Sequence, residues 1–182
     1  MSSIRAFIAV EIDPQVKQKI SKLISCLKQS SADVKWITED QMHLTLKFLG
    51  NIAEDDIKKI SDALSVISSA LKPFTIGFSG IGAFPNIDHP RVIWIGINKE
   101  ASSLKILAEK IETAMEKLGF AKKSREFTAH LTLGRIRAPR NIHNLVKLLK
   151  EIPFSIETGA IVNELALFQS TLTPKGAIYS KL

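Results

Sequence analysis

The sequence predicts a mixed α/β (α+β) domain made of two similar lobes that are related by a pseudo-two-fold axis. Two stretches of the chain repeat the same order of strand-like and helix-like segments. Each repeat contains the tetrapeptide His-Leu-Thr-Leu, beginning at His43 and at His130. A glycine-rich turn of the dinucleotide-binding kind is absent from the sequence, which argues against a doubly wound parallel sheet. We therefore expect a mostly antiparallel sheet with outer helices in each lobe, and an active-site cleft between the lobes.

Both repeats fit within one domain that spans residues 1–182. We place repeat 1 at about residues 5–85 and repeat 2 at about residues 91–170. A chain of 182 residues with 45% apolar and 24% charged residues has the size and composition of one ordinary globular domain. This composition excludes disorder or a coiled coil for the whole chain. The single cysteine excludes an intramolecular disulfide.

The first repeat alternates strands and helices. Arg5–Ile12 is rich in β-branched and apolar residues, which predicts a strand. Pro14–Leu27 has apolar residues every three or four positions and a proline suited to the first helical turn, which predicts a helix. A strand at His43–Leu49, a helix at about Glu54–Leu71 and a strand at Pro73–Ile76 complete the repeat.

The second repeat has the same order of elements. Its predicted strands and helices are Arg91–Asn98, Ala101–Leu118, His130–Ile136, about Asn141–Lys150, and Pro153–Ile156. Gly119 is a suitable residue to end the second of these elements. A last short strand is expected at about Ala177–Lys181.

The His-Leu-Thr-Leu segments place histidine and threonine on one face of each strand. Side chains alternate between the two faces of a strand, so the leucines point to the core, and Phe48 shares their face. His43, Thr45 and Lys47 share the other face, as His130 and Thr132 do in the second repeat. A pseudo-two-fold axis would bring both polar faces to one cleft. Lys47 would then either contact a phosphate there or lie in solvent.

Two imidazoles and two hydroxyls in one cleft suit displacement at phosphorus. Because histidine titrates near neutral pH, one ring can accept a proton while the other donates one. The threonine hydroxyls can donate hydrogen bonds to the phosphate oxygens. A lone histidine on a strand is usually structural. Two histidines at matched positions of a repeat favour a catalytic pair that needs no metal.

The paired motifs, which lie 87 residues apart, resemble those of the 2H phosphoesterase superfamily. Arg5-Ala-Phe-Ile-Ala-Val, the segments that begin at His43 and His130, and Gly176-Ala-Ile-Tyr resemble the RNA 2′,3′-cyclic phosphodiesterases, historically called 2′-5′ RNA ligases. The resemblance covers essentially the whole chain. Many relatives have proline before the second histidine; this chain has Ala129, a change that we expect to alter only the local backbone.

The resemblance implies metal-independent hydrolysis of an RNA 2′,3′-cyclic phosphate end to a 2′-phosphomonoester, with reversible 2′-5′ RNA ligation as the related reaction. It implies His43 as the proton donor and His130 as the proton acceptor. The residues alone leave this assignment open, because the site is nearly symmetric. No cofactor and no metal are expected. We expect a monomer in the cytoplasm that acts on RNA ends, such as those of tRNA fragments, and has no membrane partner.

Four residues are predicted to bind substrate: Thr45, Thr132, Arg135 and Phe7. The resemblance implies that Arg135 contacts the phosphate, yet simple alternation puts it on the face of Leu131 and Leu133. Either Gly134 forms a β-bulge that turns the arginine toward the cleft, which we favour, or Arg135 faces away. Phe7 has the parity to line the cleft and stack on a base, or it belongs to the core.

The charge balance favours an anionic partner and leaves rival functions open. A net charge of +7 attracts polyanions, and basic residues gather around the second motif: Lys122, Lys123, Arg125, Arg137 and Arg140. One alternative is a single-stranded RNA-binding module without catalysis; another is a cyclic phosphodiesterase that acts on a small nucleotide. A metallohydrolase is disfavoured, because the sequence has no HExxH motif and no carboxylate adjacent to either motif histidine.

Overall fold

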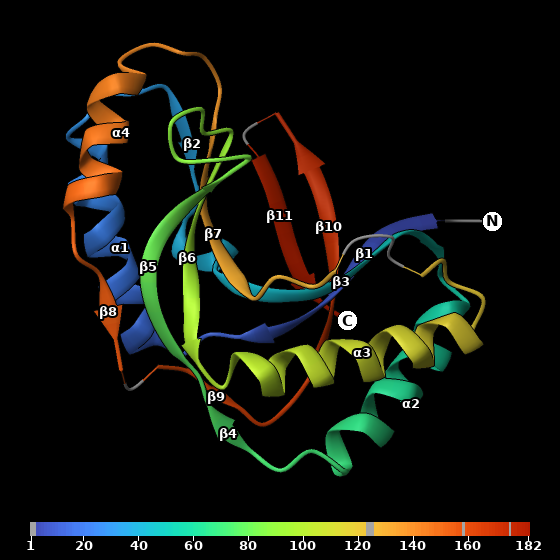
Figure 1. Cartoon of the computed structure of the whole chain (residues 1–182). Helices are drawn as coiled ribbons and strands as arrows, with labels where there is room; N and C mark the ends of the chain where they lie inside the picture. Colours follow the sequence, from blue (N-terminus) through green and yellow to red (C-terminus); the bar gives the residue numbers. More distant parts are fainter. Residues whose placement is uncertain (1–2, 123–125, 158, 175) are drawn as a thin grey trace.

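Two antiparallel sheets form the two lobes of the protein (Figure 1). The computed structural model describes residues 3–122, 126–157, 159–174 and 176–182. The first sheet has the strand order β11-β10-β1-β3 and is called the His43 sheet here; the second has the order β2-β7-β6-β5-β8 and is called the His130 sheet. A short β4-β9 pair lies apart from both sheets.

Sixteen elements make up the described part of the chain. The strands are β1 (Ser3–Glu11), β2 (Val34–Trp36), β3 (His43–Ala53), β4 (Phe74–Thr75), β5 (Gly77–Phe84), β6 (Val92–Lys99), β7 (His130–Ile136), β8 (Ser155–Ile156), β9 (Ile161–Val162), β10 (Ala166–Thr173) and β11 (Gly176–Lys181). The helices are α1 (Pro14–Lys28), α2 (Asp56–Ser69), α3 (Ala101–Lys117) and α4 (Ile142–Glu151), with one 3-10 turn, η1 (Glu39–Gln41).

The fold class predicted from the sequence is confirmed, and the lobes exchange strands. β10-β1-β3 in one sheet corresponds to β5-β6-β7 in the other. The last long strand of each repeat therefore pairs with the first strand of the other repeat: β5 with β6, and β10 with β1. Each sheet therefore contains strands from both repeats, and neither lobe coincides with one continuous half of the chain.

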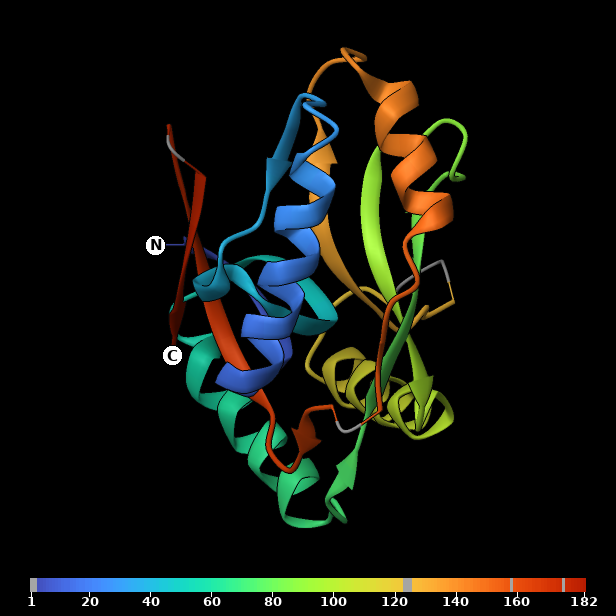
Figure 2. The same cartoon turned by 90° about the vertical axis from the view of Figure 1, so that its left-hand side faces the viewer.

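The helices lie in two pairs beside the sheets (Figures 1 and 2). α2 and α3 pack against each other and against β3 of the His43 sheet, while α4 contacts α1 and β5. The boundaries of α1 and α3 lie within one residue of the predicted ends. Gly119, just after α3, has a φ of +91°, a left-handed conformation that glycine adopts without strain.

The motif leucines lie in the core, as alternation predicts. Leu44, Leu46, Leu131 and Leu133 are fully or almost fully buried in one large apolar cluster that is shared by both sheets and the helices. Burial of these leucines fixes which face of each histidine strand packs on the core. His43 and His130 lie on the other face of their strands, and these two faces line the same cavity.

The strands β2, β5, β9 and β10 were not predicted from the sequence. β5 has glycine at three of its eight positions, which weakens the strand pattern in its sequence. At Gly82, packing requires a glycine. A side chain at Gly82 would overlap the ring of Trp94 on the adjacent strand. Within the described ranges, the structure has no helix with the length and apolar character required to cross a membrane.

Candidate active site

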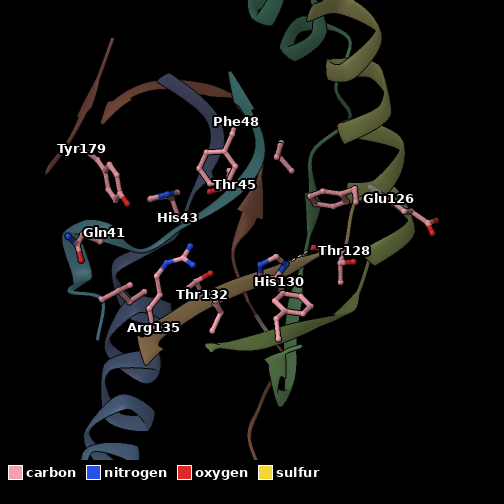
Figure 3. A pocket seen from close by; sticks show the side chains of 15 residues that line it. Gln41, His43, Thr45, Phe48, Glu126, Thr128, His130, Thr132, Arg135 and Tyr179 are labelled. Carbon is pink, nitrogen blue, oxygen red and sulfur yellow. Dashed lines mark hydrogen bonds between the residues drawn. The ribbon is translucent and has the colours of Figure 1, made fainter. Parts of the chain in front are cut away.

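Residues from both sheets line a cavity of about 400 Å³ between the lobes (Figure 3). β3 contributes His43 and Thr45, and β7 contributes His130, Thr132 and Arg135. The structure thus brings five of the six predicted site residues to one cavity. The remaining lining residues are Ile37, Gln41, Leu46, Phe48, Phe84, Val92, Glu126, Phe127, Thr128 and Tyr179.

Arg135 reaches the cavity because β7 contains a bulge. On the neighbouring strand, Trp94 faces Thr132 and the preceding residue, Ile93, faces Gly134, so Leu133 is the extra residue. A Cβ at Gly134 would lie 2.7 Å from Val34 Cγ1 and 2.9 Å from Trp36 Cε3, so this position has no room for a side chain. The bulge expected at Gly134 is present, and it turns Arg135 to the face of His130 (Figure 3).

β3 has a bulge at the equivalent place, and there it overturns the prediction for Lys47. Ala9 faces Thr45 and the preceding residue, Ile8, faces Lys47, so Leu46 is skipped in the pairing. Lys47 turns inward and is only 2% exposed. Its Nζ donates hydrogen bonds to Glu112 Oε2 at 2.6 Å and to the Ala121 carbonyl at 3.0 Å. Lys47 therefore neither contacts a phosphate nor lies in solvent.

Phe48, which the sequence analysis assigned to the core face, lies on the cavity wall. The bulge gives it the position in β3 that Arg135 has in β7, five residues after the histidine. Its side chain is 61% exposed and lines the cavity. The signal that could have revealed it is the repeat itself, because a bulge assigned to one copy should have been carried over to the other.

Phe7 lies on the cleft side of the His43 sheet, as its parity predicts, but it is covered. It is 2% exposed and belongs to a small cluster with Ala9, Ala166 and Phe168. Its ring stacks on the imidazole of His43 with a centroid separation of 4.7 Å. The expectation that Phe7 stacks on a base does not fit this burial, since its face is already occupied by His43.

The aromatic cluster determines the surroundings of His43. Phe168 lies parallel to the imidazole with centroids 5.7 Å apart, and Tyr179 meets its edge at 4.8 Å. Burial among these rings and, to a smaller extent, the positive charge of Lys17 together lower the pKa of His43 from 6.5 to about 4. At neutral pH, His43 is therefore uncharged in the unliganded protein.

His130 has different surroundings. Its Nδ1–H donates a hydrogen bond of 2.7 Å to the backbone carbonyl of Thr128, because a carbonyl oxygen can only accept (Figure 3). This bond fixes the tautomer in which Nε2 carries the lone pair. The edges of Phe84 and Trp94 contact the ring with centroid separations of 5.1 and 6.1 Å.

Arg135 and Glu126 are the lysine, arginine, aspartate or glutamate side chains that line the cavity within the described residues. Burial raises the pKa of Tyr179, while the nearby charges of Arg135 and Arg5 act in the opposite direction. Glu126 lies at the rim and pairs with Lys105. Among the described residues, no group of three histidine, cysteine, aspartate or glutamate side chains is arranged to hold a metal ion.

The predicted basic rim is described in part. Lys122, Arg137 and Arg140 are exposed, as expected for such a rim. Lys123 and Arg125 lie outside the described residues.

Comparisons with known proteins cover both repeats. The profile of the LigT-like phosphoesterase family matches residues 10–94 and residues 95–179. The chain is 33% identical over 180 residues to the RNA 2′,3′-cyclic phosphodiesterase of Methanothermobacter thermautotrophicus, covering 98% of this chain and 96% of that protein. It is 36% identical over 178 residues to the protein of the same name from Archaeoglobus fulgidus, covering 98% and 97%. A crystal structure of a Thermus thermophilus protein matches with a TM-score of 0.80 at 26% identity, covering 98% of this chain and 95% of that one.

The low pKa of His43 predicts a specific loss of stability in acid. The unfolded chain binds a proton at this histidine near pH 6.5, whereas the folded protein binds it only near pH 4. The contribution of His43 to the free energy of unfolding is therefore complete above pH 6.5 and falls as the pH drops toward 4, by about 2 kcal/mol at pH 4.5. Urea unfolding of the wild type and of His43→Asn at pH 7 and pH 4.5 measures this difference.

His143→Ala is the matched control, because His143 is exposed on α4 and should leave the acid dependence of the wild type unchanged. Equal acid sensitivity of the wild type and His43→Asn would show that the aromatic cluster does not shift this titration.

Proposed function

Because the chain belongs to the LigT-like phosphoesterase family, we propose that it hydrolyses RNA 2′,3′-cyclic phosphate ends to 2′-phosphomonoesters. One observation carries this proposal: two His–Thr pairs from equivalent strands line a single cavity together with Arg135. The relatives named RNA 2′,3′-cyclic phosphodiesterase match over nearly the whole chain, which supports the same substrate class.

In the proposed mechanism, His130 acts as the general base. The hydrogen bond from its Nδ1 to the Thr128 carbonyl holds the proton of the neutral ring on that nitrogen, and Nε2 is the proposed acceptor of a proton from the attacking water. The same carbonyl then stabilises the imidazolium that forms. As water attacks, negative charge builds on the phosphate oxygens, and the Thr45 and Thr132 hydroxyls and the Arg135 guanidinium are suited to stabilise it.

His43 is the proposed general acid, which protonates the departing 3′-oxygen. Its low pKa means that the unliganded protein holds this ring neutral. A bound phosphodiester brings a negative charge close to the imidazole, which favours uptake of a proton from solvent. The ring then gives this proton to the leaving oxygen, and a 2′-phosphomonoester and a 3′-hydroxyl result.

Ligation uses the same groups, with a 5′-hydroxyl in place of water. Its oxygen attacks the cyclic phosphate, the 3′-oxygen leaves and a 2′-5′ link forms; in the reversal, the two histidines exchange their roles. The chain itself supplies the base, the acid and the donors to the phosphate, so we propose a monomeric enzyme that needs no metal. RNA fragments with cyclic phosphate ends, tRNA fragments among them, are the proposed substrates.

Substitution of either histidine should abolish hydrolysis of a short RNA that ends in a 2′,3′-cyclic phosphate. His43→Ala and His130→Ala each remove one proton-transfer group, so kcat should fall by about 100- to 10,000-fold. Binding of the 2′-phosphorylated product should survive in both variants. The assay is run in excess chelator, and the position of the phosphate in the product is determined by NMR.

His143→Ala serves as the control, since it removes an exposed histidine outside the cavity. Normal hydrolysis by both motif variants would overturn the proposed reaction, and RNA binding without any hydrolysis by the wild type would favour a binding module. Loss of wild-type activity in chelator would contradict metal independence. Activity on cyclic mononucleotides alone would favour a small-nucleotide substrate.

Phe48 is the proposed platform for the terminal base. Its exposed ring lies on the cavity wall next to the proposed phosphate position, and exposed aromatic rings stack on bases regardless of sequence. Phe48→Ala should raise KM for the cyclic-ended RNA by about tenfold, with kcat nearly unchanged. Phe48→Tyr keeps the ring and should retain the wild-type KM. An unchanged KM for Phe48→Ala would exclude this role.

A further inference from the structure

We propose that Lys35 binds the phosphate that precedes the cyclic phosphate in the RNA chain. This inference rests on the proposed function and makes it more specific: the cleft would recognise the end of an oligonucleotide in preference to a mononucleotide. Lys35 was not among the residues that sequence analysis singled out. Its position follows from strand pairing and not from any motif.

Strand register places Lys35 beside Arg135 on the cleft face of the His130 sheet. β2 pairs antiparallel with β7, with Lys35 directly opposite Arg135. Residues directly opposite in an antiparallel pair project from the same face, with Cβ atoms about 5 Å apart. Because Arg135 lines the cavity, Lys35 lies one strand further from the centre of the site on the same face.

Lys35 and Arg135 are two positive charges that face each other across β2 and β7, so an anion bound between them would be stabilised. Like charges directly opposite one another on a sheet destabilise it, and a negative charge close to both would offset this repulsion. Across the ranges that the structure describes, neither Lys35 nor Arg135 forms an ion pair with a carboxylate. Consecutive phosphates of one RNA strand would offset both charges, one at each side chain.

The ammonium group of Lys35 lies where the two lobes meet at the end of the cleft. A Cβ at Gly176, on β11 of the His43 sheet, would lie 3.3 Å from Lys35 Nζ and 3.8 Å from Gln41 Nε2. Glycine at this position therefore leaves room for the lysine chain to cross toward the other lobe. Gln41, which also lines the cavity, donates a hydrogen bond to the Ala177 carbonyl at 2.6 Å and so fixes this end.

These positions define a path for the RNA strand. In the proposed mechanism the cyclic phosphate lies between His43 and His130, and the Arg135 side chain reaches toward the space between these two rings (Figure 3). A strand that leaves the cavity past Arg135 next meets Lys35. A cyclic mononucleotide has only the reacting phosphate, so it cannot use this second contact.

The test compares a trinucleotide that ends in a 2′,3′-cyclic phosphate with the corresponding cyclic mononucleotide. Lys35→Ala should lower kcat/KM for the trinucleotide about fivefold, mainly through KM, because the contact is made by an exposed cation. It should leave kcat/KM for the mononucleotide within about twofold of the wild type. The slope of log(kcat/KM) against log salt concentration for the trinucleotide should shrink by about 0.7, the value for one phosphate contact on a single strand.

Lys35→Arg should retain the wild-type kcat/KM for the trinucleotide. Lys110 is an exposed lysine on α3, and Lys110→Ala should leave kcat/KM for both substrates unchanged. An equal loss on both substrates, or no loss on the trinucleotide, would overturn the role of Lys35. If the wild type hydrolyses neither substrate, the proposed function fails first and the inference fails with it.

Discussion

In each lobe, the strand that carries the histidine has a β-bulge three residues after that histidine. The extra residues, Leu46 and Leu133, lie at equivalent places and stay buried in the core. Simple alternation would place the histidine, the threonine and then Lys47 or Gly134 on the cleft face. The bulge adds a third side chain, five residues after the histidine, to the same face. The presence of Phe48 and Arg135 on the cavity wall therefore depends on these two bulges.

The pseudo-two-fold relationship places equivalent residues of the two repeats at equivalent positions in the cavity, whereas the neighbours of each residue determine its charge and its hydrogen bonds. The third position is an arginine in one lobe and an exposed phenylalanine in the other. His43 lies on a buried aromatic cluster, which keeps the unliganded ring neutral, while His130 is held by a backbone carbonyl. A nearly symmetric scaffold thus places a cation on one wall of the cavity and an aromatic ring on the other. A nucleotide has the same asymmetry, with an anionic phosphate and a flat base.

Local sequence patterns were sufficient to predict the helices, both histidine strands and the shared face of histidine and threonine. Each of these features depends on periodicity within one segment. The strand exchange was not predictable in this way, because the pairing of β10 with β1 joins residues about 160 positions apart in the chain. Phe7 illustrates the same limit, since its burial depends on Phe168 and Tyr179 from the C-terminal strands.

The bulges show a second limit. Gly134 marks one bulge in the sequence, but the equivalent position in the first repeat is Lys47, a residue that gives no such signal. Its long side chain is accommodated by turning into the core and pairing with Glu112. The same geometry therefore has a visible sequence marker in one repeat and none in the other. Only a comparison of the two repeats could have moved Phe48 from the core to the cavity.

The most direct test of this account is a crystal structure of the protein with a bound nucleoside 2′-phosphate. We expect one phosphate group within hydrogen-bond distance of both imidazoles, with Arg135 on the same group and the base against Phe48. A phosphate held by only one of the two histidines, with the other ring directed elsewhere, would contradict the claim that both lobes act on a single phosphorus atom.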